Sequence, residues 1–262
     1  MVTRAPRAPS SLTAYVLHRY DWSETSLILD LFTREQGRVA AAAKGAKRPY
    51  SQLRPVLLPF QRLNVALGRV PKSEAGEEAV SEVQNLRSAE WAGGAAMLTG
   101  AALFSGFYLN ELLMKLMARH DPHPLLFDTY AQTLPCLADA DDLKVQAALR
   151  AFELRLLKEI GVLPDLSLVT LTQEDVRQDA GYALLPEAGV AAPRSDEVQV
   201  CGTVLIGLQA ALSHGSVAAL QQASASALPE LRTMLRALLH YHLGSPVLRT
   251  RQVMLDVQSL ER

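Results

Sequence analysis

The residues that could do chemistry gather first in one short basic stretch, Lys44-Gly45-Ala46-Lys47-Arg48-Pro49-Tyr50. Three cations and an aromatic ring lie close together there, and the glycine and the proline are typical of a loop. Cations neutralise phosphates, and an exposed ring offers a face on which a nucleotide base can stack. The stretch therefore indicates a binding site for nucleic acid, although a solvated loop that merely happens to be basic has the same sequence pattern.

Positive charge is concentrated in the first part of the chain, whereas the whole protein is nearly neutral. The 262 residues carry a net charge of −1, but residues 1–72 hold twelve Lys and Arg against four Asp and Glu. That segment therefore has a net charge of +8, and the remainder has −9. A basic segment on a near-neutral protein favours a polyanion as the partner of one domain only.

Sequence patterns for catalysis are weak. The basic stretch lacks the G-x-x-x-x-G-K-[ST] pattern of nucleotide hydrolases, and no paired carboxylates or Ser/His/Asp arrangement stands in a recognisable context. The two cysteines, Cys136 and Cys201, are 65 residues apart, and the chain has no C-x-x-C pair. That spacing argues against a disulfide framework and against a cysteine-based zinc site. We predict a non-enzymatic protein with no catalytic residue and no cofactor.

Metal binding by histidine and insertion into a membrane are also disfavoured. His120 and His123 have no evident third ligand, and His240 and His242 face apart on a helix. The N-terminus is basic but has no apolar core of a secretory signal. The apolar segment 95–117 contains too many polar residues and glycines for a membrane span. We expect a cytoplasmic protein with no metal and no membrane contact.

The elements that must position the basic stretch are strands. Alternating apolar residues predict strands at 13–20, 25–32, from 38 to the basic stretch, 60–67 and 79–86, with polar loop residues at 68–76. Short strands at this spacing, with a basic bias, favour a small closed barrel of the OB-fold type over a sandwich. We expect a flexible tail over 1–10 and an OB-fold DNA-binding domain over 11–87.

The period changes from strand to helix at about Ser88. Apolar spacing and capping residues predict helices at 90–119, 124–134, 141–160, 202–212, 229–243 and 249–260. Residues 162–200 are loop-like, with a hairpin around Gly181-Tyr182. The fold class is therefore α+β, a five-stranded barrel followed by an all-helical domain over 88–262.

The helix at 141–160 carries an arginine within an apolar stripe. Leu143, Ala147, Leu154 and Leu157 form the stripe, and Arg150 falls in its middle. A second stripe consists of Leu149, Phe152, Leu156 and Ile160. A guanidinium among apolar side chains can receive a carboxylate attached to a hydrophobic peptide. Pairing with Glu153 one turn on, or extension into water, remains the alternative and is favoured by spacing alone.

Several runs along nearly the whole chain resemble the bacterial RecO recombination mediators. Those in the first part are Val16-Leu17, Ser23-Glu24-Thr25-Ser26-Leu27, Leu31-Phe32-Thr33-Arg34, Gly37-Arg38, Ala43-Lys44-Gly45-Ala46-Lys47-Arg48 and Leu58-Pro59-Phe60. Those in the second part are Tyr108-Leu109-Asn110-Glu111-Leu112-Leu113, Leu149-Arg150-x-Phe152-Glu153-Leu154 and Tyr241-His242-Leu243-Gly244. The match is weakest over 162–200.

The resemblance implies a function and partners. It implies a DNA repair protein that binds and anneals single- and double-stranded DNA and helps load RecA onto strands coated by single-strand-binding protein. RecR and the acidic, hydrophobic C-terminal tail of single-strand-binding protein are the implied protein partners, and an arginine at the position of Arg150 is associated with the tail. Many similar proteins hold zinc through four cysteines in the region of 162–200, where this chain has only Cys201 nearby. We expect that zinc-finger-like region to be degenerate and metal-free.

Two sets of site residues follow. The predicted DNA-binding residues are Arg19, Arg34, Arg38, Lys44, Lys47, Arg48, Tyr50 and Arg54, and the predicted residues for the tail are Arg150, Leu154 and Leu157. Tyr20, Trp22 and Tyr50 are candidates for stacking on bases, and a core position for Trp22 is an equal alternative. The competing function is a protein adaptor, whose helical domain recruits repair partners while DNA binding is incidental.

Overall fold

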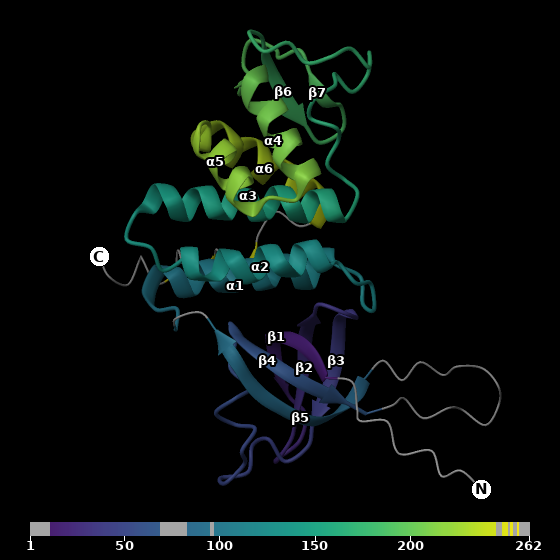
Figure 1. Ribbon diagram of the computed structural model, residues 1–262, viewed down its shortest axis with the longest axis vertical. Helices are drawn as coiled ribbons and strands as arrows, with labels where there is room; N and C mark the ends of the chain where they lie inside the picture. The colour runs from purple at the N-terminus through teal and green to yellow at the C-terminus, as the bar shows by residue number, and fades with distance from the viewer. Residues whose placement is uncertain are drawn as a thin grey trace, which may run out of the picture. The chain divides into compact units, whose positions relative to one another are not determined.

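A computed structural model describes residues 11–68, 83–94, 97–244, 248–250, 252–253 and 256 (Figure 1). The chain divides into two compact units, one of residues 1–97 with Met117–Pro124 and one of Leu98–Leu116 with residues 125–262. The tail predicted at 1–10, the loop at 69–76 and the end of the helix predicted at 249–260 lie outside the described residues.

The first unit is a closed five-stranded barrel with the strand order β1-β2-β3-β5-β4. Its strands are β1 (Ser11–Asp21), β2 (Leu27–Thr33), β3 (Gly37–Ala43), β4 (Gln61–Leu67) and β5 (Val83–Gly94). β3 and β5 run parallel, and the other neighbouring pairs are antiparallel. Closure leaves no long unpaired edge, which is how small β domains avoid aggregation through exposed strands. The predicted OB-fold barrel is confirmed.

Alternate side chains of these strands fill the barrel. Leu29 and Leu31 of β2, Val39 and Ala41 of β3, and Leu63 of β4 all belong to the buried core. Successive side chains of a strand point to opposite faces, so the residues between these positions are available to solvent or to neighbouring segments. The period of two in the sequence therefore located β1 to β4 to within two residues.

β5 ends later than predicted. The prediction was 79–86, of which residues 79–82 lie outside the described residues, whereas the strand Val83–Gly94 continues through residues that had been assigned to a helix. Leu86 and Ala89 pack on the barrel core, and Ala89 pairs with Val65 of β4. The register shifts between Ala66 and Leu67 of β4, and such a break in alternation hides the strand period in the sequence.

The segment Met117–Pro124 belongs to the barrel unit and packs on the β2–β3 hairpin. The His120 backbone N–H donates to the Arg38 carbonyl at 2.9 Å. Gly37 has a φ of +67°, and a Cβ atom there would overlap the backbone carbonyl of Asp121. Glycine is therefore required at this turn both by conformation and by the close approach of another segment.

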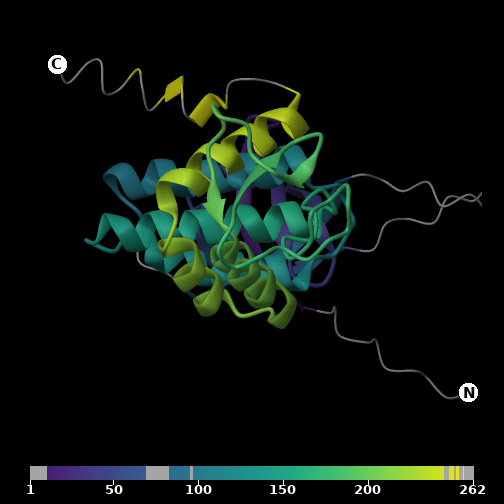
Figure 2. The ribbon, with the colours of Figure 1, turned by 90° about the horizontal axis from the view of Figure 1, so that it is seen from above.

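The second unit is built from six helices within the described residues, α1 (Gly100–Leu116), α2 (Pro124–Cys136), α3 (Asp142–Glu159), α4 (Gly202–His214), α5 (Val217–Ala225) and α6 (Leu228–Leu243). Figure 2 shows α3 crossing this unit with α6 on one side and α5 on the other, and both helices pack on it. Asp141 caps α3 by accepting a hydrogen bond from the Leu143 backbone N–H, and Gly161 follows the helix with a φ of +76°. Both ends of α3 were therefore visible in the sequence.

Three features of the helical unit differ from the prediction, namely the strand β8, the helix α5 and the end of α2. Residues 162–200 include the hairpin β6 (Gly181–Leu185) and β7 (Gly189–Ala191), and β8 (Val200–Cys201) completes a three-stranded sheet. α5 was not predicted, although Ser216 caps it by accepting a hydrogen bond from the Ala219 backbone N–H. α2 runs past Pro135, where we had expected it to stop. The predicted hairpin around Gly181-Tyr182 is confirmed.

No group of three or more His, Cys, Asp or Glu side chains that could hold a metal ion occurs among the described residues. Within the same residues, none of the helices combines the length and apolar character that crossing a membrane requires.

Candidate nucleic-acid interface and partner pocket

Six of the eight predicted DNA-binding residues lie at one end of the barrel. The register pairs Asp21 with Leu27 and Leu27 with Ala43, so β1 ends, β2 begins and β3 ends at the same place. We call this place the loop end and define it as residues 19–26 and 44–58. It contains Arg19, Lys44, Lys47, Arg48, Tyr50 and Arg54.

Backbone hydrogen bonds fix the shape of the basic stretch at the loop end. The Lys47 N–H donates to the Thr25 carbonyl at 2.9 Å, and the Gly45 N–H donates to Ser26 Oγ at 3.3 Å. Ala46 is buried in the barrel core, and Gly45 has a φ of +71°. An anchor at the centre of the stretch leaves the side chains on either side, Lys44 and Arg48, in solvent.

Two cations of the loop end have polar partners. Lys47 Nζ lies 3.0 Å from Asp21 Oδ1 and donates to the Ser23 carbonyl at 3.2 Å. Asp21 is 79% exposed and Lys47 is 34% exposed, so water and salt reach the ion pair and screen its attraction, and a phosphate can compete with Asp21. Arg19 Nη1 donates to the Leu57 carbonyl at 3.2 Å. That bond holds the long β3–β4 connection against β1.

Aromatic rings are exposed at the same end. Tyr50 has 95% of its surface exposed and lies in a shallow depression lined by residues 49–52, 54 and 55. Trp22 is 58% exposed, which excludes the alternative that it is part of the barrel core, and Tyr20 is also exposed. The rings therefore meet the requirement for base stacking, a face in solvent beside positive charge.

One exposed ring escaped the sequence analysis. Trp91 of β5 is 65% exposed, and its indole N–H donates to Gln61 Oε1 of β4 at 3.1 Å. The hydrogen bond fixes the orientation of the ring on the outside of the barrel. Trp91 was not among the predicted stacking residues because its segment had been assigned to a helix of the second domain, and not to the barrel.

Two predicted DNA-binding residues lie at the opposite end, and one of them has a structural role. Arg34 is exposed in the β2–β3 turn. Arg38 is only 13% exposed; its Nε and Nη2 donate to the Asp30 carboxylate at 3.0 and 3.2 Å, and its Nη1 donates to the Met117 carbonyl at 2.9 Å. A buried carboxylate already engages the guanidinium of Arg38, which argues against a role in DNA binding, and the assignment of Arg38 to the DNA-binding set stays a prediction.

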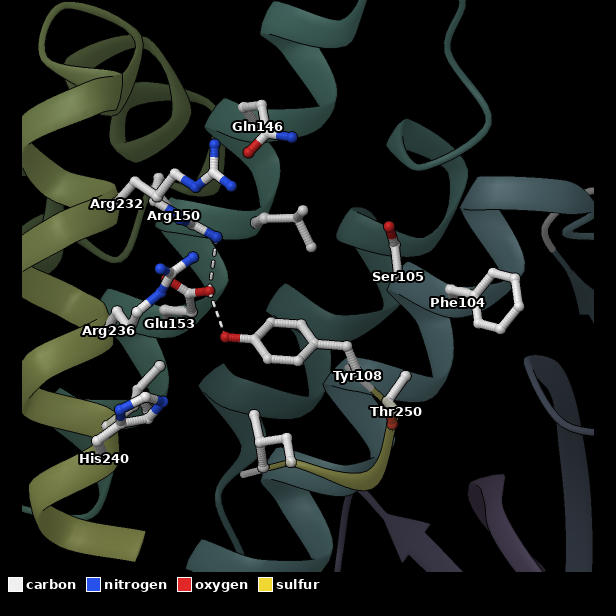
Figure 3. Close-up of a pocket in the computed structure, with 13 residues that line it drawn as sticks. Phe104, Ser105, Tyr108, Gln146, Arg150, Glu153, Arg232, Arg236, His240 and Thr250 are labelled. Carbon is white, nitrogen blue, oxygen red and sulfur yellow. Dashed lines mark hydrogen bonds and ion pairs between the residues drawn. The ribbon is translucent and has the colours of Figure 1, made fainter. Parts of the chain in front are cut away.

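The helical unit has a pocket of about 240 Å³ in the described residues, which α1, α3, α6 and the segment after α6 surround (Figure 3). Its lining consists of Phe104, Ser105, Tyr108, Gln146, Leu149, Arg150, Glu153, Arg232, Arg236, Leu239, His240, Leu248 and Thr250. The apolar members, with charged groups among them, make a site for a ligand that has both characters.

A buried chain of polar groups forms one wall of the pocket. Tyr108 donates to Glu153 Oε1 at 2.6 Å, and Arg150 Nη2 donates to the same oxygen at 2.7 Å (Figure 3). Burial raises the pKa of Glu153, against the opposing effect of Arg150. Burial and the neighbouring Glu153 also hold the pKa of Tyr108 well above its usual value, so the phenol stays a donor. Arg150 Nε and Glu153 Oε2 are buried without a hydrogen-bond partner in the described part of the chain.

α6 contributes a row of basic side chains to the same pocket. Arg232, Arg236 and His240 are four residues apart, so they lie along one face of the helix. Arg232 and Arg236 are exposed and act electrostatically on Glu153. The charged lining residues are three arginines and one glutamate, which leaves the pocket with excess positive charge.

The predicted tail-binding residues separate in the structure. Arg150 lines the pocket and pairs with Glu153, which was the alternative that its spacing favoured. Leu154 and Leu157 are fully buried and do not line the pocket, which argues against contact with a partner, and their assignment to the tail stays a prediction. α3 is covered on more than one side, and this buries Ala147, Leu154 and Leu157 of their stripe, whereas Leu143 at the start of the helix is exposed. Leu149 of the other stripe lines the pocket instead.

A second carboxylate fixes the pocket wall that follows α6. Glu111 of α1 accepts from the Arg249 and Thr250 backbone N–H groups at 2.9 Å each, and from the Thr250 hydroxyl at 2.7 Å. Lys115 Nζ lies 3.3 Å from its Oε1. Burial alone would raise the pKa of Glu111, but these donors together lower it. Leu248 and Thr250 are thereby held in the pocket lining.

Comparison with known proteins covers almost the whole chain. Residues 9–87 match the family model for the N terminal of recombination protein O, and residues 97–252 match the model for its C terminal. The chain is 52% identical over 253 residues to the DNA repair protein RecO of Polaromonas naphthalenivorans (strain CJ2), which covers 96% of this chain and 98% of that protein. It is 48% identical over 267 residues to the DNA repair protein RecO of Acidovorax ebreus (strain TPSY), with 98% and 100% covered.

Proposed function

Because this chain belongs to the RecO family of DNA repair proteins, we propose that it is a non-enzymatic recombination mediator. In this proposal the protein binds and anneals DNA strands and helps load RecA onto strands coated by single-strand-binding protein, in the cytoplasm at the nucleoid. The observation that carries the proposal is the loop end, where six predicted residues combine exposed cations with an exposed ring.

The chemistry of the loop end fits DNA binding with little sequence preference. Lys44, Arg48 and Arg54 are exposed cations that can neutralise phosphates and release counterions. Tyr50 and Trp22 offer ring faces, and each stacked base contributes about 1–3 kcal/mol. Annealing requires that the mutual repulsion of two strands be screened, and a cationic surface does this without a chemical step. Both single- and double-stranded DNA are ligands in this proposal.

The helical unit would recruit the protein partner. We propose that the pocket of α1, α3 and α6 receives the acidic, hydrophobic tail of single-strand-binding protein. An apolar lining with excess positive charge supports this ligand class. RecR is proposed as a further partner on the basis of family membership alone.

DNA affinity measured against salt concentration tests the first part of the proposal. We expect the variant Arg48→Glu/Arg54→Glu to bind labelled single-stranded DNA about 100-fold more weakly than the unaltered protein, and the slope of log K against log salt to shrink by about 1.4. The matched control is Arg62→Glu/Arg87→Glu, which makes the same change of charge at exposed residues outside the loop end and outside the predicted DNA-binding set. Equal loss in the two variants, or no loss in the first, would contradict a binding site at the loop end.

The pocket also supports a second candidate function, that of a protein adaptor whose DNA binding is incidental. If that function is the correct one, Arg48→Glu/Arg54→Glu should retain recruitment of partners and strand annealing on coated DNA. A mediator instead loses annealing in this variant while it still binds the tail peptide. Annealing of complementary strands coated with single-strand-binding protein, followed by fluorescence, distinguishes the two.

A further inference from the structure

A cation lies beside the exposed ring of Trp22. Lys47 Nζ lies 3.0 Å from Asp21 Oδ1 and donates to the Ser23 carbonyl at 3.2 Å. Trp22 is the residue between these two partners, so the ammonium lies against the backbone that carries the indole. The N–H groups of Trp22 and Ser23 both donate to the Ser26 carbonyl, at 3.3 and 3.4 Å, which closes a turn and fixes that backbone. Trp22 therefore combines a largely exposed ring with an adjacent positive charge.

Tyr50 forms a second combination of a ring with a cation. Tyr50 and Arg54 line the same shallow depression, and both side chains are exposed. The third ring of the loop end, Tyr20, is less suited to stacking on a base, because it packs edge-on against His18 with 4.4 Å between the ring centroids. Trp22 and Tyr50 are also more exposed than Tyr20. These two residues therefore present the larger accessible ring faces.

A ring and a cation respond differently to the two forms of DNA. Cations neutralise phosphates in single strands and in duplexes, and they favour the duplex, whose phosphates are more densely spaced along its axis. A ring can stack on a base only where the base has an accessible face, as in a single strand. In a duplex each base is stacked on its neighbours, and unstacking or flipping it has a free-energy cost. A preference for single strands must therefore come from the rings and not from the cations.

We infer that Trp22 and Tyr50 make the loop end discriminate in favour of unpaired strands. The inference rests on the proposed DNA binding at the loop end and assigns its strand selectivity to two residues. Annealing removes the accessible base faces, so the rings lose their contacts while the cations keep theirs. The contribution of the rings to DNA affinity thus disappears when the duplex forms, which favours release of the annealed product.

Affinities for the two forms of DNA, measured on the full chain, test the inference. The probes are a fluorescein-labelled oligonucleotide of mixed sequence and the same oligonucleotide paired with its complement, at one salt concentration. We expect Trp22→Ala/Tyr50→Ala to bind the single strand about 30-fold more weakly, which corresponds to one stacked base on each ring, and to bind the duplex within about 2-fold of the unaltered protein. Most of the loss should appear as faster dissociation from the single strand.

Three further variants serve as controls. Trp22→Phe/Tyr50→Phe keeps a ring at both positions and should bind the single strand within about 5-fold of the unaltered protein. Trp91→Ala removes an exposed tryptophan of the barrel outside the loop end and should leave both affinities unchanged. Arg48→Glu/Arg54→Glu should weaken binding of the single strand and of the duplex, since both present phosphates.

The outcomes separate the inference from the proposal on which it rests. An equal loss of single-strand and duplex binding in the alanine variant, or no loss of either, overturns the inference. It is also overturned if the phenylalanine variant or Trp91→Ala loses as much single-strand affinity as the alanine variant. If Arg48→Glu/Arg54→Glu binds both forms as the unaltered protein does, the loop end is not the DNA-binding site, and the proposed function loses its support together with the inference.

Discussion

The barrel and the helical unit each contain a buried arginine paired with a carboxylate, and the two pairs differ in how completely they are satisfied. In the barrel, three nitrogens of Arg38 donate, two to Asp30 and one to the Met117 carbonyl, and Arg119 lies 3.9 Å from the same carboxylate. In the helical unit, Arg150 gives one hydrogen bond to Glu153, while its Nε and Glu153 Oε2 stay without partners among the described residues.

The difference separates a structural ion pair from one beside a ligand site. Buried polar groups are hydrogen-bonded in most folded proteins, so an incomplete set needs an explanation. The Arg38 pair joins the β2–β3 hairpin to the segment Met117–Pro124 and lines neither the pocket of the helical unit nor the depression at Tyr50. The Arg150 pair instead forms the wall of a cavity whose other charges come from exposed arginines. The completeness of the hydrogen bonding, and not the type of residue, therefore distinguishes the structural ion pair from the ion pair beside a ligand site.

The largest expected effect comes from breaking the barrel pair. Arg38→Met leaves Asp30 buried with only the distant Arg119, and loss of one partner of a buried ion pair costs about 3–5 kcal/mol of stability. Urea unfolding of the full chain measures the loss. The control Arg38→Met/Asp30→Leu removes both charges and should recover most of it, since an apolar replacement carries no unpaired charge. Destabilisation below about 1 kcal/mol in the single variant would show that the pair is not structural.

A smaller loss, with a distinctive pH dependence, is expected when Arg150 is replaced. In Arg150→Met, Glu153 keeps the hydrogen bond from Tyr108 and the influence of Arg232 and Arg236, so we expect a cost of about 2 kcal/mol. Burial raises the pKa of Glu153 above its ordinary 4.5, and Arg150 opposes this effect. Without Arg150 the pKa rises further, so the folded state holds a proton that the unfolded state has released.

The sign of the pH effect follows from that proton. Stability falls as the pH rises from the ordinary carboxyl pKa through the raised pKa of folded Glu153, because the unfolded state binds fewer protons there. Arg150→Met should therefore be less destabilised at about pH 5 than at about pH 8. Urea unfolding at both pH values measures the difference, and a deficit that does not change with pH would contradict the role given to Arg150.

The sequence revealed most of the fold because local signals agreed with the tertiary structure. Alternation located β1 to β4, and the capping residues Asp141 and Gly161 located both ends of α3. The prediction of β5 was wrong at its end because the break in register disrupts the alternation of apolar residues. The helix α5 was not predicted because a short helix contains few turns in which apolar residues can repeat. Neither error arises from the intrinsic strand or helix propensity of the residues. In both cases neighbouring elements decide the structure.

The candidate site was predictable in its residue types and less so in its partners. The charge count identified the basic loop end, but no pattern distinguishes Arg38, which meets Asp30 across a hairpin, from Arg48, which meets solvent. The pairing of Arg150 with Glu153 was visible as a helical spacing of three. The contribution of Arg232 and Arg236 was not, because they lie some 80 residues away on a helix that only the fold brings to α3.

Tyr108→Phe tests the same wall of the pocket with a smaller perturbation. The hydroxyl donates to Glu153 Oε1 at 2.6 Å, and its removal should cost about 1.5 kcal/mol, because a hydrogen bond to a charged group is stronger than a neutral one. The matched control is Tyr130→Phe, whose buried hydroxyl donates to neutral Asn110 at the same distance. Thermal unfolding should show a pH-dependent loss only for Tyr108→Phe, since only that bond involves a titrating group. The same pH profile for both variants would mean that Glu153 does not carry the effect.

The smallest expected effect concerns Glu111, a carboxylate in the helical unit whose two oxygens are both satisfied, as those of Asp30 are. Because both oxygens of Glu111 accept hydrogen bonds, we assign it a structural role like that of Asp30, although the segment that it anchors lines the pocket. Glu111→Gln should leave global stability nearly unchanged and speed hydrogen exchange at the Arg249 and Thr250 amides about 10-fold, which corresponds to one weakened acceptor. The donors around Glu111 lower its pKa, so this anchoring is complete above the ordinary carboxyl pKa and is lost as the pH falls through the lowered value. Protection of the two amides, taken relative to their intrinsic exchange rate at each pH, should therefore fall on acidification in the unaltered protein and not in Glu111→Gln. If the substitution leaves exchange at these amides unchanged, then hydrogen bonding to both carboxylate oxygens does not identify a structural carboxylate.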